Sequence, residues 1–279
     1  MNFINEERIQ AFGKHLIEEE KATATVEKYV HDVTVFAEWL GSRDLEKTIV
    51  LAYKADLCEH HAPASVNAAL SSLNRFFDFC GRHDLRVKNL KIQRQMFASS
   101  DKELTKAEYE RLLTAAKSKQ NERLYLLMQT ICSTGIRVSE LRFITVEAVD
   151  RGIAEINCKG KRRQVFLPKE LRKMLSQYLR SQKRKSGAVF VTKNGNPLDR
   201  SNIWSDMKKL CKSAGVSEKK VFPHNLRHLF ARTFYSLQKD VVRLADILGH
   251  SSINTTRIYT METGAVHRRQ IERLGLLRC

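Results

Sequence analysis

Residues 222–228 read Phe-Pro-His-Asn-Leu-Arg-His, the most informative stretch of this 279-residue chain. His224 precedes Arg227 by three residues, so on one helical turn both side chains would project from the same face and could reach one phosphate. The planar guanidinium of arginine suits that task because it gives two parallel, charge-assisted hydrogen bonds to phosphate. We therefore expect a phosphate-binding helix here, and we assign the adjoining His228 mainly to packing.

Three further stretches carry side chains that such a site would use. Leu-Gly-His at 248–250 is followed by Tyr259, Arg137 lies in Thr-Gly-Ile-Arg at 134–137, and Lys159 lies in Cys-Lys-Gly-Lys at 158–161. Metal-free cleavage of a phosphodiester requires a nucleophile, cations for the non-bridging oxygens and an acid for the departing 5′ oxygen. Tyrosine attacks poorly at its free pKa of roughly 10, so neighbouring cations must favour the phenolate.

The net charge of +18 is unevenly distributed along the chain. Residues 1–100 hold 13 Lys and Arg against 14 Asp and Glu, whereas residues 101–279 hold 36 against 17. All of the basic excess therefore lies in the part that carries the candidate site residues. This coincidence favours nucleic acid as the partner over an acidic protein or a membrane.

Composition excludes several other classes of protein. A hydrophobic fraction of 42% and a charged fraction of 29% are typical of a soluble globular protein. The sequence has no apolar run near the roughly 20 residues that a membrane span needs, and no signal-peptide pattern begins it. Six cysteines without a C-x-x-C pair indicate reduced thiols rather than disulfides or a zinc module. We expect a cytoplasmic protein without a metal or cofactor.

The first 85 residues have the periodicity of a helical bundle. Apolar side chains recur at helical spacing over 9–17, 26–40 and 66–77, with a further helix expected from about Leu45 to His60. Gly41 closes the second helix, and Ser65 is expected to cap the fourth. Residues 86–103 break the periodicity with basic and polar residues, which predicts a linker between two domains. The remaining chain, 104–279, forms the second domain.

Most of the second domain is also expected to be helical. Thr105 and Glu108 fit a capping box, and a buried helix should run from Leu124 to Thr134 and end at Gly135. A new helix should start near Val138. Short β-rich runs at 153–157 and 164–167 flank a basic turn and predict a hairpin, to which 188–191 could add a third strand. The fold class is therefore mainly α with one small sheet.

Taken together, these stretches resemble the tyrosine recombinase (phage integrase) family, and the short Xer-like integrases most closely. The run from His224 to His228 matches the family's second signature almost residue for residue. The resemblance implies a two-domain clamp, with a helical core-binding (SAM-like) domain at 1–85 and a catalytic domain of the DNA breaking-rejoining fold at 104–279. No additional arm-binding domain is evident ahead of residue 1, in contrast to the larger phage integrases.

The same resemblance implies a role for each site residue. Tyr259 would be the nucleophile that joins the 3′ phosphate. The scissile phosphate would be held by four side chains: Arg137, His224, Arg227 and His250. Lys159 at the hairpin tip would be the general acid, although Lys161 is an alternative because strand alternation could place it on the same side. Lys161, Arg162 and Arg163 are further candidates for DNA contact, and Tyr235 is the alternative nucleophile.

Two features are open to more than one interpretation. Glu140 resembles the acidic residue that orients the first arginine, but it could equally be an ordinary helix-start carboxylate. The tail at 265–277 has apolar residues at helical spacing with a basic face. It could pack on its own domain or, by the resemblance, dock into a neighbouring protomer.

The family resemblance implies a site-specific recombinase acting on double-stranded DNA. Four protomers would assemble on two sites and exchange strands through a Holliday junction, without ATP or metal. The outcome, integration or excision of a mobile element or dimer resolution, and any accessory partner are not encoded in these motifs. The alternatives are a type IB topoisomerase, which would relax DNA without recombination, and a non-catalytic DNA-binding accessory protein, which would not require Tyr259.

Overall fold

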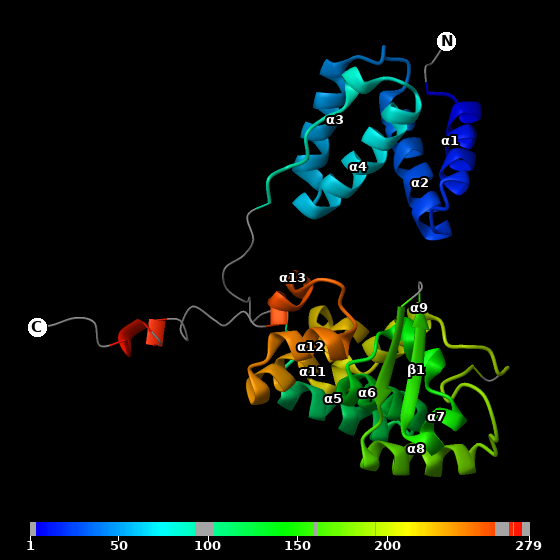
Figure 1. Ribbon diagram of the computed structural model, residues 1–279, viewed down its shortest axis with the longest axis vertical. Helices are drawn as coiled ribbons and strands as arrows, with labels where there is room; N and C mark the ends of the chain where they lie inside the picture. Colours follow the sequence, from blue (N-terminus) through cyan, green and yellow to red (C-terminus); the bar gives the residue numbers. More distant parts are fainter. Residues whose placement is uncertain are drawn as a thin grey trace, which may run out of the picture. The chain divides into compact units, whose positions relative to one another are not determined.

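The computed structural model describes residues 4–92, 103–158, 161–192, 194–259, 268–269 and 271–274 (Figure 1). The chain divides into two compact units, Met1–Arg94 and Gln95–Cys279. Most described residues are helical, and the described strands form one two-stranded sheet. The predicted fold class, mainly α with a small sheet in the second unit, is therefore confirmed.

The N-terminal unit is a four-helix bundle. Its elements are α1 (Glu6–Glu18), α2 (Thr23–Leu40), α3 (Lys47–His60), α4 (Pro63–Phe79) and the 3-10 helix η1 (His83–Leu85). Phe12, Phe36 and Phe76 are fully buried at its centre. Gly41 ends α2, as predicted. The predicted Ser65 cap is wrong: α4 begins at Pro63, whose missing N–H needs no partner at a helix start, and Ser65 lies inside the first turn.

The second unit is built around a buried helix. Its α elements are α5 (Lys106–Ser118), α6 (Glu122–Thr134), α7 (Val146–Arg151), α8 (Lys169–Ser181), α9 (Arg200–Lys208), α10 (Cys211–Ala214), α11 (Pro223–Gln238), α12 (Val241–Leu248) and α13 (Ile253–Thr256). Helix α6 packs against α5, α8 and α11. The capping box of Thr105 and Glu108 is present, and α6 ends at Gly135 in the left-handed conformation.

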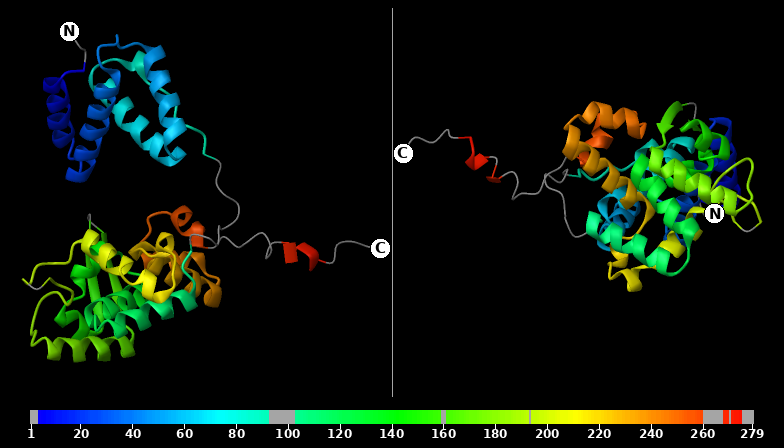
Figure 2. Two further views of the ribbon diagram at one scale, coloured as in Figure 1. Left: turned by 180° about the vertical axis from the view of Figure 1, so that it is seen from behind. Right: turned by 90° about the horizontal axis from the view of Figure 1, so that it is seen from below.

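Short 3-10 segments join these helices near the site. They are η3 (Val138–Phe143), η4 (Glu218–Lys220) and η5 (Arg257–Tyr259). The helix predicted near Val138 is therefore present as a 3-10 helix. Figures 1 and 2 show α12 and α13, in orange, on the side of the unit away from α8. None of the described helices is long and apolar enough to cross a membrane.

The predicted hairpin is formed by β1 (Ile153–Cys158) and β2 (Lys161–Phe166), which pair antiparallel from Ile153 with Phe166 to Cys158 with Lys161. One face is buried through Ala154, Ile156 and Val165. The possible third strand at 188–191 is not formed. Ala188 and Val191 make only isolated bridges, because the segment pairs with the loop after η3 and with Pro197 instead of a hairpin edge.

Candidate active site

Arg227 lies at the centre of the site and is almost wholly enclosed. It comes from α11, and only 1% of its surface is exposed. Its Nη2 donates to Leu248 O at 2.7 Å and lies 3.0 Å from His250 Nε2, while Nη1 donates to Gly135 O. The end of α6 and the end of α12 are thereby joined by one guanidinium. Two stretches that are more than 100 residues apart in the sequence meet at this side chain.

Arg137 approaches the same place from the junction of α6 and η3. Its Nη1 donates to Glu140 Oε1 at 3.0 Å, and its Nη2 donates to Gly249 O at 3.4 Å. The side chain is 40% exposed, so its guanidinium remains accessible to a ligand. Arg137 and Arg227 thus bind adjacent carbonyls, those of Gly249 and Leu248, and their charges lie side by side.

Glu140 combines the two roles that its position in the sequence left open. Its Oε2 accepts the backbone N–H of Arg137 at 2.9 Å, as a helix-start carboxylate does, while its Oε1 holds the Arg137 guanidinium. The residue is only 3% exposed. Burial raises the pKa of this carboxyl, but the backbone N–H and the nearby guanidinium groups outweigh burial and lower the pKa overall.

Tyr259 is enclosed by histidine rings. It lies on η5 and is 3% exposed. The ring of His228 stands edge-on to it at 4.8 Å, and the ring of His250 is stacked at 6.0 Å. The Nδ1 of His250 lies 2.8 Å from Thr256 Oγ1, which links His250 to α13 just before the tyrosine. The packing role predicted for His228 thus has a specific target, the candidate nucleophile.

Burial and the neighbouring positive charges lower the pKa values of the histidines. Burial, followed by Arg227 and Arg137, lowers the pKa of His250 to about 4. Loss of solvent contact, followed by the same arginines, also lowers the pKa of His224. Burial and the charge of Arg137 lower the pKa of Arg227 to about 10. These shifts share one direction, against positive charge, and they mark a site that would favour an anion.

Two openings lead to Arg137. A cavity of about 710 Å³ lies between η3, β2 and the end of α12 and is lined by Glu140, Arg162, Asp246 and His250 among others. A second, of about 760 Å³, lies along α9 and the start of α11 and is lined by Trp204, His224 and Arg227 among others. A ligand in either opening can therefore contact Arg137. The predicted residues Arg137, His224, Arg227, His250 and Tyr259 converge on this region.

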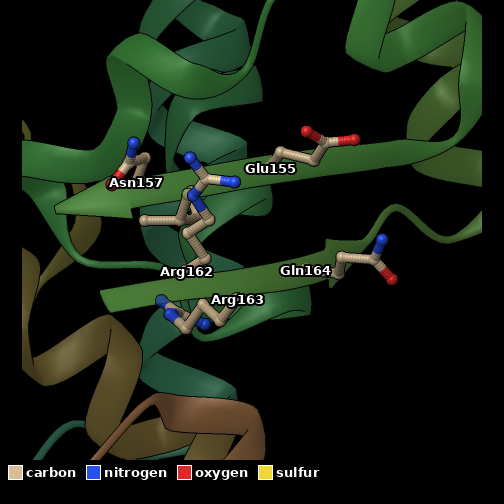
Figure 3. A pocket seen from close by; sticks show the side chains of 6 residues that line it. Glu155, Asn157, Arg162, Arg163 and Gln164 are labelled. Carbon is tan, nitrogen blue, oxygen red and sulfur yellow. The ribbon is translucent and has the colours of Figure 1, made fainter. Parts of the chain in front are cut away.

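The hairpin residues are placed differently from one another. Arg162 and Arg163 project to opposite sides of β2 (Figure 3). Arg162 is exposed, as expected of a DNA contact. Arg163 is only 13% exposed, and its guanidinium donates to Glu140 and to the carbonyl of Ile247. It therefore has a structural connection that we did not predict. Strand alternation could have indicated it, since residue 163 shares a face with the buried Val165.

Some predicted features lie outside the described residues. Lys159 is one of them, and the side chain of Lys161 is also not described. Most of the tail at 265–277 is likewise outside them. Tyr235, the alternative nucleophile, packs against the cluster of Ala231, Leu244 and Leu248, with the Lys239 amine over its ring. In the described parts of the chain, no group of three or more His, Cys, Asp or Glu side chains is arranged to hold a metal ion.

The paired arginines, the histidines and the buried tyrosine are the kinds of group that phosphoryl chemistry on a polyanion would use. Comparison with known proteins identifies its family. The pattern described as "Phage integrase family" matches residues 102–265, and that of "Phage integrase, N-terminal SAM-like domain" matches residues 9–83. Tyrosine recombinase XerA of Thermococcus kodakarensis is 32% identical over 97% of this chain and 96% of its own. Tyrosine recombinase XerD of Vibrio cholerae is 27% identical over 86% of each chain.

Solved structures agree with this assignment. The crystal structure of XerA recombinase matches 98% of this chain and 99% of its own at 26% identity, with a TM-score of 0.54. A lambda integrase dimer bound to a COC′ core site has a TM-score of 0.73 over 92% of this chain and 77% of its own. Its 18% identity shows the fold alone. The chain belongs to the phage integrase family, and it is a site-specific recombinase of the tyrosine type.

Proposed function

We propose that this recombinase cleaves and rejoins double-stranded DNA through a 3′-phosphotyrosyl intermediate on Tyr259. The observation that carries the proposal is the enclosure of Tyr259 by His228 and His250 directly beside the contact between Arg227 and His250. A nucleophile and the cations for a phosphate are thereby within one group of packed side chains. Relatives that match almost the whole chain are tyrosine recombinases, which favours this use of the site.

In the proposed step, the phenolic oxygen of Tyr259 attacks the phosphorus, and the bond from phosphorus to the 5′ oxygen breaks. Arg137 and Arg227 bind the non-bridging oxygens, where negative charge accumulates in the transition state. His224 and His250 complete the phosphate site as neutral hydrogen-bonding groups, because their pKa values are lowered. Reversal of the same step by a 5′ hydroxyl rejoins the strand, so the energy of the phosphodiester is retained.

The departing 5′ oxygen needs a proton, and we assign its delivery to Lys159, with Lys161 as the alternative. In the sequence, Lys159 comes directly after β1, and Lys161 is the first residue of β2. The bonds of Arg163 in β2 support this assignment. They join the strand to Glu140 and, through Glu140, to Arg137 in the phosphate site. Arg162, exposed on the other face, and Lys161 are proposed as contacts to the DNA backbone. Neither a metal nor a cofactor is required by these steps.

For the assembly, we propose a clamp of two domains on DNA, with 1–85 as the core-binding domain, 86–103 as the linker and 104–279 as the catalytic domain. Lambda integrase, a protein of the same fold, has been solved as a tetramer bound to a Holliday junction. We propose a tetramer for strand exchange here also, with the tail after Tyr259 docking into a neighbouring protomer. The site of action would be the cytoplasm, where the DNA of a bacterial or archaeal cell lies.

The alternatives are less well supported. A topoisomerase-like enzyme or an accessory protein would be expected to have relatives with those names. The relatives quoted above, XerA and XerD, are instead tyrosine recombinases. Relaxation of a supercoiled plasmid that carries two target sites, without any recombinant product, would instead support the topoisomerase.

The test is the change Tyr259→Phe, with Tyr235→Phe as the matched control. Both variants lose one phenolic oxygen within the same small apolar cluster. A DNA substrate nicked near the cleavage position traps the covalent adduct because the released end diffuses away. We expect the Tyr259 variant to bind this DNA normally and form no adduct, and the Tyr235 variant to form it. Adduct formation by the Tyr259 variant would refute the assignment of the nucleophile.

A further inference from the structure

Three arginines converge on the carboxyl end of α12. Arg163 Nη1 donates to Ile247 O at 2.6 Å, Arg227 Nη2 to Leu248 O at 2.7 Å, and Arg137 Nη2 to Gly249 O at 3.4 Å. The three come from β2, α11 and the start of η3, and they bind successive carbonyls. The last carbonyls of a helix lack partners within the helix and carry partial negative charge, so they are natural acceptors for guanidinium groups.

Arg163 shares its second partner, Glu140, with Arg137 but is less exposed than Arg137. Its Nη2 donates to Glu140 Oε2 at 2.6 Å, so both of its terminal nitrogens are bound within the protein. Its side chain is 13% exposed, compared with 40% for Arg137. Arg163 is directed at Glu140 on one side and at the end of α12 on the other. Breaking the bond to Glu140 would remove one partner of a buried carboxylate.

The connections of Arg163 reach both phosphate-binding arginines. Through Glu140 it is linked to the backbone N–H and to the guanidinium of Arg137. Through the end of α12 it is linked to the carbonyl that orients Arg227, and His250 follows directly. Arg163 belongs to β2, the strand that follows the basic turn in the sequence. Its bonds therefore also connect this strand to Glu140 and to the end of α12.

We propose that Arg163 is a positioning residue, which fixes Glu140 and the carboxyl end of α12 and thereby holds Arg137, Arg227 and His250 in the geometry for phosphate binding. This inference rests on the proposed function of the site. It assigns to Arg163 an effect on the chemical step and not on DNA affinity, since it does not itself touch the phosphate. A misplacement of about 1 Å among reacting groups can slow a reaction about a hundredfold.

The chain offers a matched control in Arg172. This arginine of α8 binds the carboxyl end of α7, with Nε donating to Val149 O at 2.9 Å and Nη2 to Asp150 O at 2.5 Å. It contacts none of the site residues in those bonds. Arg172→Met therefore removes an arginine with the same local role, at a helix end that takes no part in the proposed chemistry. Arg163→Met removes the one at the site.

The experiment measures two quantities for each variant: the dissociation constant for target DNA, and the single-turnover rate of adduct formation on nicked DNA at saturating protein. For Arg163→Met we expect a rate about a hundredfold lower, with DNA affinity within about threefold of the parent. For Arg172→Met we expect both values close to the parent, with the same or greater loss of thermal stability. A variant that loses affinity and salt dependence but keeps the saturated rate would overturn the proposal and make Arg163 a DNA contact.

A second comparison serves if Arg163→Met does not fold. Arg163→Lys keeps the charge but cannot reproduce both bonds of the planar guanidinium, so the saturated rate should still fall, about tenfold or more. In a Glu140→Gln background, either change at Arg163 should have a much smaller effect than in the parent, because the shared partner is altered. Full, independent effects of the two changes would contradict positioning through Glu140. Tyr259→Phe is measured in parallel. Its result tests only the assignment of the nucleophile, so failure of the proposed function can be distinguished from failure of the inference about Arg163.

Discussion

Gly249→Ala should disable the site through a single added methyl group. Gly249 follows α12 with φ +65° and ψ 46°, a left-handed conformation that glycine adopts easily. A Cβ atom placed there would lie 2.5 Å from Arg163 Cδ and 2.8 Å from its Nε. Ordinary van der Waals contact begins near 3.4 Å. Arg163 or the end of α12 must therefore move by nearly 1 Å.

The magnitude follows from two separable terms. The left-handed conformation costs an L-residue about 1–2 kcal/mol, which should appear as lost stability. The collision adds to this by displacing a guanidinium whose bonds to Ile247 O and Glu140 are both 2.6 Å long. Charge-assisted bonds of this kind contribute roughly 1.5–3 kcal/mol each to stability. A displacement of about 1 Å also predicts a cleavage rate about a hundredfold lower.

Two glycines in the same unit separate these terms. Gly215 has φ +59° at the end of α10 with no atom within 4 Å of its added Cβ, so Gly215→Ala should show the conformational cost alone. Gly152 has φ +79° at the end of α7, and its added Cβ would lie 2.9 Å from Arg172 Nη1. Gly152→Ala therefore reproduces both the conformation and a collision with an arginine, away from the site.

The assay is single-turnover adduct formation on nicked DNA, together with thermal unfolding. All three variants should unfold at lower temperature than the parent. Only Gly249→Ala should lose the cleavage rate at saturating protein. If Gly249→Ala cleaves as fast as Gly152→Ala, the carboxyl end of α12 does not position the phosphate-binding groups, and our reasoning about Arg163 is wrong as well.

Two further predictions concern pH and salt. His228 and His250 each have a pKa lowered to about 4, below the ordinary 6.5, so the unfolded chain takes up protons first as the pH falls. The stability that these neutral histidines contribute should be fully present above about pH 6.5 and decline toward pH 4, by on the order of 1 kcal/mol per histidine. His228→Gln should make this decline shallower when the free energy of unfolding is measured in urea. An identical decline in the variant would contradict the prediction. Because residues 101–279 hold all of the basic excess, that fragment should retain most of the salt dependence of DNA binding. This dependence is the slope of log K against log salt concentration, at about 0.9 per phosphate contact. A slope below half that of the full chain would show that the N-terminal unit makes many of the phosphate contacts.

Local rules predicted the parts of the fold that local chemistry controls. Gly41 and Gly135 end helices as expected, and Gly249 ends a third, because each position needs a backbone conformation that glycine adopts at low cost. The capping box at Thr105 was readable for the same reason. Ser65 misled us because Pro63 competes for the helix start, and the fixed φ of proline begins the helix three residues earlier than a Ser65 cap would.

Long-range partners were not readable from spacing. The residues of the site were predicted individually from their motifs, but nothing in the sequence near residues 247–249 indicates that their carbonyls bind three arginines from other elements. Arg163 was grouped with Arg162 as a DNA contact since both belong to one basic run. The pairing of Arg163 with Ile156, on the buried face of the hairpin, separates the two.

The use of carbonyls to hold these arginines has an electrostatic consequence. A carboxylate on each guanidinium would orient it equally well, but would also neutralise it and compete with the phosphate. A carbonyl at a helix end supplies direction with only partial negative charge. Of the three arginines, Arg137 and Arg163 share the single carboxylate of Glu140, and Arg227 donates to the carbonyls of Gly135 and Leu248. Burial, followed by the positive charge that remains, lowers the pKa of Arg227 to about 10 and that of His250 to about 4. The site is thus oriented before DNA arrives while its charge is still available, and binding of a phosphate should raise both pKa values.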